Sequence, residues 1–103
     1  MAYKVVETEL AVQDLNGILE YIAFSLANPT AASAFADEVE KCYADLESMP
    51  LMYERCQDAQ LRALGYRKAV IKNYLLIYKV NETEKNVYIL RFFYGGQNYV
   101  ELI

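Results

Sequence analysis

The residues that could carry chemistry in this chain are basic, acidic and phenolic side chains, because histidine is absent from all 103 positions. The sequence therefore argues against a histidine-based catalytic triad and against a zinc site. Any chemistry would use Lys, Arg, Tyr, Glu or Asp, and no catalytic residue can be assigned. Two cysteines are too few for a disulfide framework. Cys42 is predicted to be buried between helices, and Cys56 lies in a predicted loop where it could react.

Charge is divided unequally between the two halves of the chain, whose formal net charge is −4. Residues 1–60 carry a net charge of −8, and residues 61–103 carry a net charge of +4. Two interpretations stay open. Either the second half meets an anion or an acidic partner, or acidic helices lie against a basic sheet and neutralise it.

The basic second half contains the polar residues that are candidates for contact with a target. Arg67 and Lys68 are adjacent in a predicted strand, so their side chains should point to opposite faces of the sheet. Arg91 lies in a strongly apolar strand, where pairing with a helix carboxylate is favoured over a catalytic role. Polar side chains at the end of that strand would stand on a rigid base; they are Tyr94, Gln97 and Asn98.

Two helices are predicted before this polar set. Thr8 is the predicted N-cap of the first, and apolar residues then recur at steps of three and four as far as Leu26. Asn28-Pro29 ends this helix and begins the second, which closes at Met49-Pro50. Gly17 is predicted to face the alanine-rich second helix, where a missing side chain would allow a close approach. The pair should form an antiparallel hairpin, followed by a loop with one helical turn.

Three segments rich in β-branched and aromatic residues follow, at residues 66–72, 74–80 and 87–94. Their short connections predict an antiparallel meander, because parallel neighbours would need a longer crossover. Tyr74 and Tyr78 share one face of the central strand and are assigned to the core. With a short strand at residues 3–6, the order is β-α-α-β-β-β. We predict one α+β domain over residues 1–103, in which an N-terminal strand and an antiparallel helical hairpin pack on an antiparallel sheet.

Several short motifs, each weak by itself, follow one another along nearly the whole chain. They are Ala11-x-x-Asp14-Leu15-x-x-Ile18-x-x-Tyr21-Ile22, Asn28-Pro29-x-Ala31-Ala32, Leu46-x-x-Met49-Pro50, Leu64-Gly65-Tyr66-Arg67-Lys68, the strand that opens Asn73-Tyr74-Leu75-Leu76, and Val87-Tyr88-Ile89-Leu90-Arg91 with its continuation to Asn98. In this order and spacing the sequence resembles the RelE/ParE superfamily of toxins from type II toxin–antitoxin modules, and the ParE-like branch more closely.

The resemblance implies a small toxin that arrests growth and is neutralised by a co-expressed antitoxin, as in plasmid stabilisation modules. ParE-like toxins act on DNA gyrase and lack nuclease residues. RelE-like toxins are ribosome-dependent mRNA endoribonucleases that use Lys and Arg on the sheet with a Tyr near the C-terminus. Here Leu75 replaces the arginine that follows the strand tyrosine, and Gly95-Gly96-Gln97 replaces the basic run. A gyrase inhibitor is therefore favoured over an mRNA endoribonuclease or an inactive fold that only binds antitoxin.

Under this interpretation the target-facing residues are Arg67, Lys68, Arg91, Tyr94, Gln97 and Asn98. No cofactor and no metal is implied. The expected partners are a cognate antitoxin protein and either DNA gyrase or the ribosome with its mRNA. No segment approaches the about 18 uninterrupted apolar residues of a membrane span. The first residues also lack the apolar run of a secretion signal, so a cytoplasmic protein is expected.

Overall fold

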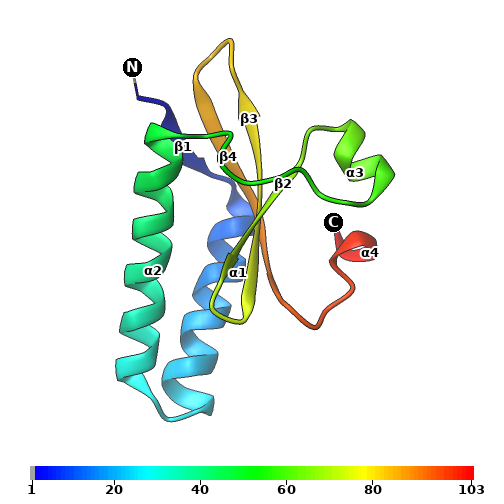
Figure 1. Cartoon of the computed structure of the whole chain (residues 1–103). Coiled ribbons are helices and arrows are strands. Elements are labelled where there is room, and N and C mark those ends of the chain that lie inside the picture. Colours follow the sequence, from blue (N-terminus) through cyan, green and yellow to red (C-terminus); the bar gives the residue numbers. More distant parts are fainter. Residues whose placement is uncertain (1) are drawn as a thin grey trace.

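The computed structural model describes residues 2–103, and its two main helices pack on one face of a four-stranded sheet (Figure 1). The strands are β1 (Lys4–Glu7), β2 (Arg67–Ile71), β3 (Tyr74–Asn81) and β4 (Asn86–Tyr94). The helices are α1 (Glu9–Glu20), continued by the π-helical turn η1 (Tyr21–Ser25), then α2 (Pro29–Ser48), α3 (Ala59–Ala63) and α4 (Tyr99–Leu102). The structure confirms the predicted α+β class and the predicted order of the main elements.

Side-chain caps begin the two helices of the hairpin. Thr8 Oγ1 accepts a hydrogen bond from the Ala11 amide at 3.3 Å, and Asn28 Oδ1 accepts one from the Ala31 amide at 3.0 Å. Pro29 occupies the first turn of α2, where its missing amide hydrogen costs nothing. Both caps lie where the sequence predicts them, and α2 also ends at the predicted position.

Gly17 does not face α2, so that prediction is wrong. A Cβ built on Gly17 would meet no atom within 4 Å, and no neighbouring helix uses the missing side chain. At about 100° per residue, Gly17 lies roughly 120° around α1 from the fully buried Ala11. The side of α1 that packs on the core is formed by other residues, namely Ala11, Leu15 and Ile18. Gly17 borders the cleft beside α1 instead.

The sheet has the strand order β1-β4-β3-β2, which confirms the predicted antiparallel meander of β2, β3 and β4. The N-terminal strand differs from the prediction, because β1 pairs parallel to β4 and makes the sheet mixed. The helical hairpin carries the chain to the far edge at β2, and the meander then brings β4 back beside β1 (Figure 1). Pairing with β1 ends at Ile89, so the last part of β4 has an open edge.

Two apolar clusters lie on opposite faces of the sheet. The larger joins the hairpin to one face and includes Cys42 and Tyr78, as predicted. The smaller lies on the other face and contains Cys56, Leu61, Ile77 and Phe93. Cys56 is fully buried, and burial raises the pKa of its thiol. The interpretation of Cys56 as an accessible loop thiol is therefore wrong.

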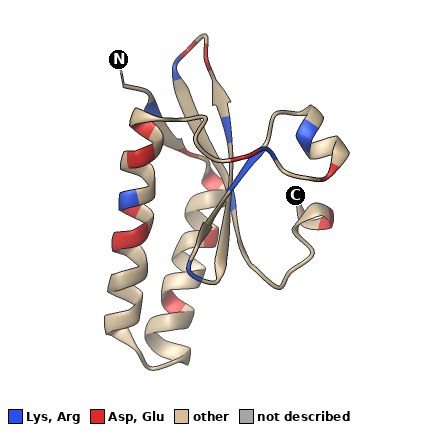
Figure 2. Cartoon of the chain, viewed as in Figure 1, with Lys and Arg blue, Asp and Glu red and all other residues tan. Residues whose placement is uncertain are grey.

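Most acidic residues lie on the helices, and most basic residues lie on the strands or their connecting turns (Figure 2). Within residues 2–103, however, only Arg91 and Asp14 form an ion pair. Direct ion pairing between the helices and the sheet is therefore limited to this pair. The alternative interpretation, in which the remaining basic residues meet an anion or an acidic partner, stays a prediction. No helix in the same range is both long and apolar enough to cross a membrane.

Candidate functional site

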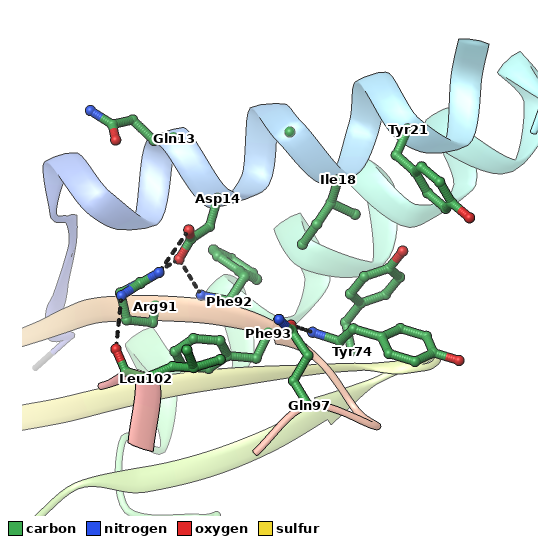
Figure 3. Close-up of a pocket in the computed structure, with 12 residues that line it drawn as sticks. Gln13, Asp14, Ile18, Tyr21, Tyr74, Arg91, Phe92, Phe93, Gln97 and Leu102 are labelled. Carbon is green, nitrogen blue, oxygen red and sulfur yellow. Dashed lines mark hydrogen bonds and ion pairs between the residues drawn. The ribbon is translucent and has the colours of Figure 1, made fainter. Parts of the chain in front are cut away.

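A cleft of about 740 Å³ lies between α1, the end of β4 and the C-terminal segment (Figure 3). Its α1 wall consists of residues spaced to lie on one side of the helix: Gln13, Asp14, Gly17, Ile18 and, at the start of η1, Tyr21. The opposite wall consists of Tyr74, Arg91, Phe92, Phe93, Tyr94, Gln97 and Leu102. Three of the predicted target-facing residues therefore meet here: Arg91, Tyr94 and Gln97.

A carboxylate holds Arg91 at one end of the cleft. Arg91 Nε lies 2.6 Å from Asp14 Oδ2 and Nη2 lies 3.2 Å from Oδ1, so the contact is bidentate. Nη1 also donates to the Leu102 carbonyl at 3.4 Å, and the guanidinium carbon lies 4.8 Å from the centre of the Phe93 ring. The hydrogen bond to Asp14 raises the pKa of Arg91. These contacts confirm the predicted pairing of Arg91 with a helix acid.

Asp14 has a second function at the open edge of β4. Beyond Ile89, no strand of residues 2–103 pairs with this edge, and its outward amides need acceptors. Asp14 Oδ2 accepts a hydrogen bond from the Phe92 amide at 3.0 Å, and Gln97 Oε1 accepts one from the Tyr94 amide at 2.7 Å. Side chains therefore satisfy this edge in place of a neighbouring strand.

Three tyrosines line the other end of the cleft. The Tyr74 and Tyr94 rings lie edge to face, with centres 5.7 Å apart. Tyr21 faces Tyr74 from η1 (Figure 3). Burial raises the pKa of Tyr74, and the neighbouring Tyr21 and Tyr94 add to this effect. The Tyr74 hydroxyl therefore stays protonated at neutral pH and can donate or accept. Tyr74 packs on the core as predicted, but it also forms part of the cleft.

A tight turn after β4 positions Gln97. The Gln97 amide donates to the Tyr94 carbonyl at 2.9 Å, and the Gly95 amide donates to the Asn73 carbonyl at 2.7 Å. A Cβ on Gly95 would lie 2.9 Å from that carbonyl oxygen, which leaves no room for a side chain. Glycine at this position therefore lets the turn approach the β2–β3 connection closely.

The other three predicted residues lie outside the cleft. Arg67 Nη1 donates to the Tyr53 carbonyl at 2.7 Å, whereas Lys68 Nζ lies 5.6 Å from the centre of the Tyr99 ring. Because Tyr53 packs with the helix-side cluster and Tyr99 with the opposite one, the predicted placement of Arg67 and Lys68 on opposite faces is confirmed. Asn98 is exposed before α4 and caps no amide with its side chain. Their contact with a target stays a prediction.

None of the residues that α1 contributes to the cleft is among the predicted target-facing residues. Asp14, Gly17 and Tyr21 are spaced by three and four positions, so a helix places them in a row. That row interrupts the apolar pattern with one acid, one glycine and one phenol, which is a usable signal. This row of α1 residues forms a cleft only because β4 lies opposite it, and the spacing of residues within α1 does not reveal which strand lies opposite.

The cleft offers rings and hydrogen-bonding groups rather than a free reactive group. Its one carboxylate, Asp14, already accepts from Arg91 and from the Phe92 amide. Within the described range, no three His, Cys, Asp or Glu side chains are grouped as metal ligands would be. This arrangement suits recognition of another surface by stacking and hydrogen bonding.

The fold, with helices packed on a four-stranded sheet, matches the folds of RelE/ParE-type proteins among solved structures. The chain is similar to the chromosomal ParDE toxin–antitoxin system from P. aeruginosa, with a TM-score of 0.71 and 18% identity over 90% of this chain and 96% of that chain. It is similar to the RelBE2 toxin–antitoxin complex from Mycobacterium tuberculosis, with a TM-score of 0.65 and 24% identity over 91% of this chain and 99% of that chain. It is also similar to the RelE–RelB complex from Pyrococcus horikoshii, with a TM-score of 0.66 and 19% identity over 94% of this chain and 99% of that chain.

The family assignment comes from the sequence itself. Residues 5–99 match the family described as the ParE toxin of the type II toxin-antitoxin system, parDE. The chain belongs to this family and is therefore the toxin component of a type II toxin–antitoxin system. No curated protein matches the chain.

Proposed function

We propose that this toxin inhibits DNA gyrase, that it acts in the cytoplasm, and that a cognate antitoxin neutralises it. In this proposal the cleft beside α1 contacts gyrase. Tyr21, Tyr94 and Gln97 supply the exposed rings and amide for that contact. Asp14 and Arg91 hold the wall of the cleft in shape.

The observation that carries the proposal is the compensated charge of Arg91. RNA cleavage needs cations free to stabilise the charge that develops on the reacting phosphate. The Arg91 guanidinium is bound to Asp14 in a bidentate contact, and Leu75 stands where RelE-like toxins have a strand arginine. A net charge of −4 also opposes binding to ribosomal RNA. A cleft of this character fits a protein surface better than a phosphate backbone.

The test combines purified components with living cells. Purified toxin added to gyrase, relaxed plasmid and ATP should inhibit supercoiling. Tyr94→Ala should weaken that inhibition about tenfold, as expected for the loss of an aromatic contact residue. Lys79→Ala, an exposed change elsewhere on the sheet, should stay close to the wild type.

Induced expression without antitoxin separates the alternatives. Growth arrest with intact mRNA and impaired gyrase supports the proposal. Arrest with new codon-spaced mRNA ends would instead identify a ribosome-dependent endoribonuclease. No arrest from soluble, folded protein would leave an inactive toxin fold that binds antitoxin.

The endoribonuclease stays the second candidate because of one contact. Lys68 lies beside the Tyr99 ring, with 5.6 Å between Nζ and the ring centre. This places a lysine and a C-terminal tyrosine together on the sheet face, the residue types that the resemblance to RelE-like toxins implies for RNA cleavage. Lys68→Ala should abolish mRNA cleavage if this candidate is correct, whereas for a gyrase inhibitor mRNA should stay intact with or without the substitution.

An antitoxin partner is supported by the exposed apolar tip of the hairpin. Phe24 is 80% exposed, and it borders a groove formed with Leu19, Ala23, Ala32 and Ala36. Such a groove favours cover by a partner. The product of an adjacent gene should co-purify with the toxin at fixed stoichiometry, and Phe24→Glu should weaken the complex. If Phe24→Glu bound the antitoxin with full affinity, the antitoxin would have to contact the toxin at another surface.

A further inference from the structure

The outer edge of β1 carries backbone groups without partners. The Lys4 amide donates to the Lys85 carbonyl at 2.9 Å, and the Thr8 amide donates to the Ile89 carbonyl at 3.1 Å. Because backbone groups alternate in direction along a strand, the intervening odd-numbered residues point away from β4. The Val5 and Glu7 amides accordingly have no acceptor within residues 2–103. They form an edge ready to pair with another strand.

The structure covers its other sheet edges at least in part. At β2, the Glu54 carbonyl accepts from the Lys68 amide at 3.2 Å, and the Cys56 amide donates to the Tyr66 carbonyl at 2.9 Å. At the end of β4, side chains of the cleft accept from the outward amides. The β1 edge lacks comparable cover beyond Tyr3, whose amide donates to the Glu47 carbonyl at 2.9 Å.

A groove of about 540 Å³ runs between this edge and the last turns of α2. Its charged lining is mainly acidic, with Glu7, Glu40 and Glu47 against Lys4. Figure 2 shows acidic residues along the part of α2 that lies near β1. Tyr43 forms part of the groove wall and donates its hydroxyl to Glu7 Oε2 at 2.8 Å.

We propose that the β1 edge binds an extended segment of a partner protein, which adds as a fifth strand and carries Lys or Arg at alternate positions. The backbone of the segment pairs with Val5 and Glu7, and its basic side chains on the helix side meet Glu40 and Glu47. These two glutamates are seven residues apart on α2, or roughly 10 Å along the helix axis. On one face of a strand, side chains two residues apart are separated by about 6.6 Å and side chains four residues apart by about 13 Å. The spacing of the two glutamates lies between these values, so the long, flexible side chains of two basic residues can reach both.

The acidic lining argues for a different protein rather than a second copy of this chain. Two β1 edges paired with each other would place two acidic grooves side by side, each lined by Glu7, Glu40 and Glu47. Like charges across paired strands are destabilising. The proposal concerns a surface separate from the gyrase-facing cleft, because the groove and the cleft share no lining residue.

The test uses the full-length toxin and a short capped peptide that alternates Lys with Val. Hydrogen exchange followed by NMR should show new protection at the Val5 and Glu7 amides when the peptide is added. The same peptide with Glu in place of Lys should give no protection. Unchanged exchange at both amides, or protection confined to β2, would overturn the proposal.

Charge reversal on α2 supplies the matched control. The double variant Glu40→Lys with Glu47→Lys should weaken binding of the lysine peptide about tenfold, since two attractive pairs become repulsive. The double variant Asp37→Lys with Glu38→Lys makes the same change in net charge at exposed positions of the same helix outside the groove, and it should bind within about twofold of the wild type. Equal weakening by the control would mean that only the net charge matters. Self-association of the toxin through this edge would also contradict the proposal.

Discussion

Asp14 of α1 and Arg91 of β4 lie 77 positions apart in sequence, and their side chains meet at 2.6 Å between Oδ2 and Nε. The same Asp14 oxygen accepts the Phe92 amide at 3.0 Å. The carboxylate therefore fixes α1 to the open part of β4 through one side-chain contact and one backbone contact. Both side chains are mostly buried, with 18% of Asp14 and 23% of Arg91 exposed. This junction shapes one end of the cleft.

Replacing Asp14 should lower the free energy of unfolding more than replacing an exposed acidic residue does. Asp14→Ala leaves the Arg91 guanidinium and the Phe92 amide without their acceptor. We expect a loss of about 1–3 kcal/mol in the free energy of unfolding, measured by urea denaturation. Glu20→Ala, an exposed acid on the same helix, should change the free energy of unfolding by less than about 0.5 kcal/mol. Equal effects of the two changes would mean that the ion pair contributes nothing.

Gly17 offers a way to separate stability from function. It lies within α1 with no atom within 4 Å of a built Cβ, so Gly17→Ala should stabilise the protein by up to about 1 kcal/mol. Gly17→Leu should instead extend into the cleft and weaken inhibition of the target without unfolding the chain. Thermal melts and the supercoiling assay measure the two effects. A lower melting temperature for Gly17→Ala would show that the open space beside Gly17 is occupied in solution.

The two glycines after β4 should respond differently to substitution. Gly95→Ala places a Cβ 2.9 Å from the Asn73 carbonyl oxygen, a backbone atom that cannot move without distorting the turn. We expect a loss of about 1–3 kcal/mol, measured by urea denaturation. Gly96→Ala meets only the Tyr94 ring at 3.0 Å, and an exposed ring can turn aside. A larger loss for Gly96→Ala than for Gly95→Ala would contradict this arrangement.

Alkaline pH should destabilise the fold through Tyr78. This tyrosine is fully buried and donates to the Pro50 carbonyl at 3.0 Å, and burial raises its pKa from 10.0 to about 12. The unfolded chain therefore releases this proton first as pH rises. The contribution of Tyr78 is fully present below pH 10 and is lost between pH 10 and about pH 12, by about 2–3 kcal/mol in total.

Urea denaturation between pH 7 and 12 measures this dependence. Tyr78→Phe should lower stability at neutral pH because it removes the hydrogen bond to Pro50, and it should flatten the fall above pH 10. Cys42→Ala is the control, because burial raises the pKa of Cys42 from 9.0 to about 11 and its own effect begins at lower pH. If Tyr78→Phe and the wild type fell equally above pH 10, the ionisation of Tyr78 would not be responsible.

Local sequence signals were sufficient for the boundaries of the hairpin. Thr8 and Asn28 cap helices because their side-chain oxygens accept amide hydrogens three residues further on, a relationship contained within one turn. The burial of Tyr78 follows from its place in a strand that is apolar on both faces. Gly17 shows where such reasoning fails, because a glycine in a helix indicates a close neighbour only when a neighbour is actually there.

The sequence by itself determined the α+β class, the order of the main elements and the resemblance to a toxin family, because period, caps and motifs act over a few residues. Tertiary structure alone decided that β1 runs parallel to β4 and that Asp14 meets Arg91 and the Phe92 amide. It also divided the predicted polar set, keeping Arg91 and Tyr94 in the cleft and Arg67 outside it. These outcomes depend on packing between segments far apart in the chain, and residue spacing along one segment carries no information about which distant partner lies opposite.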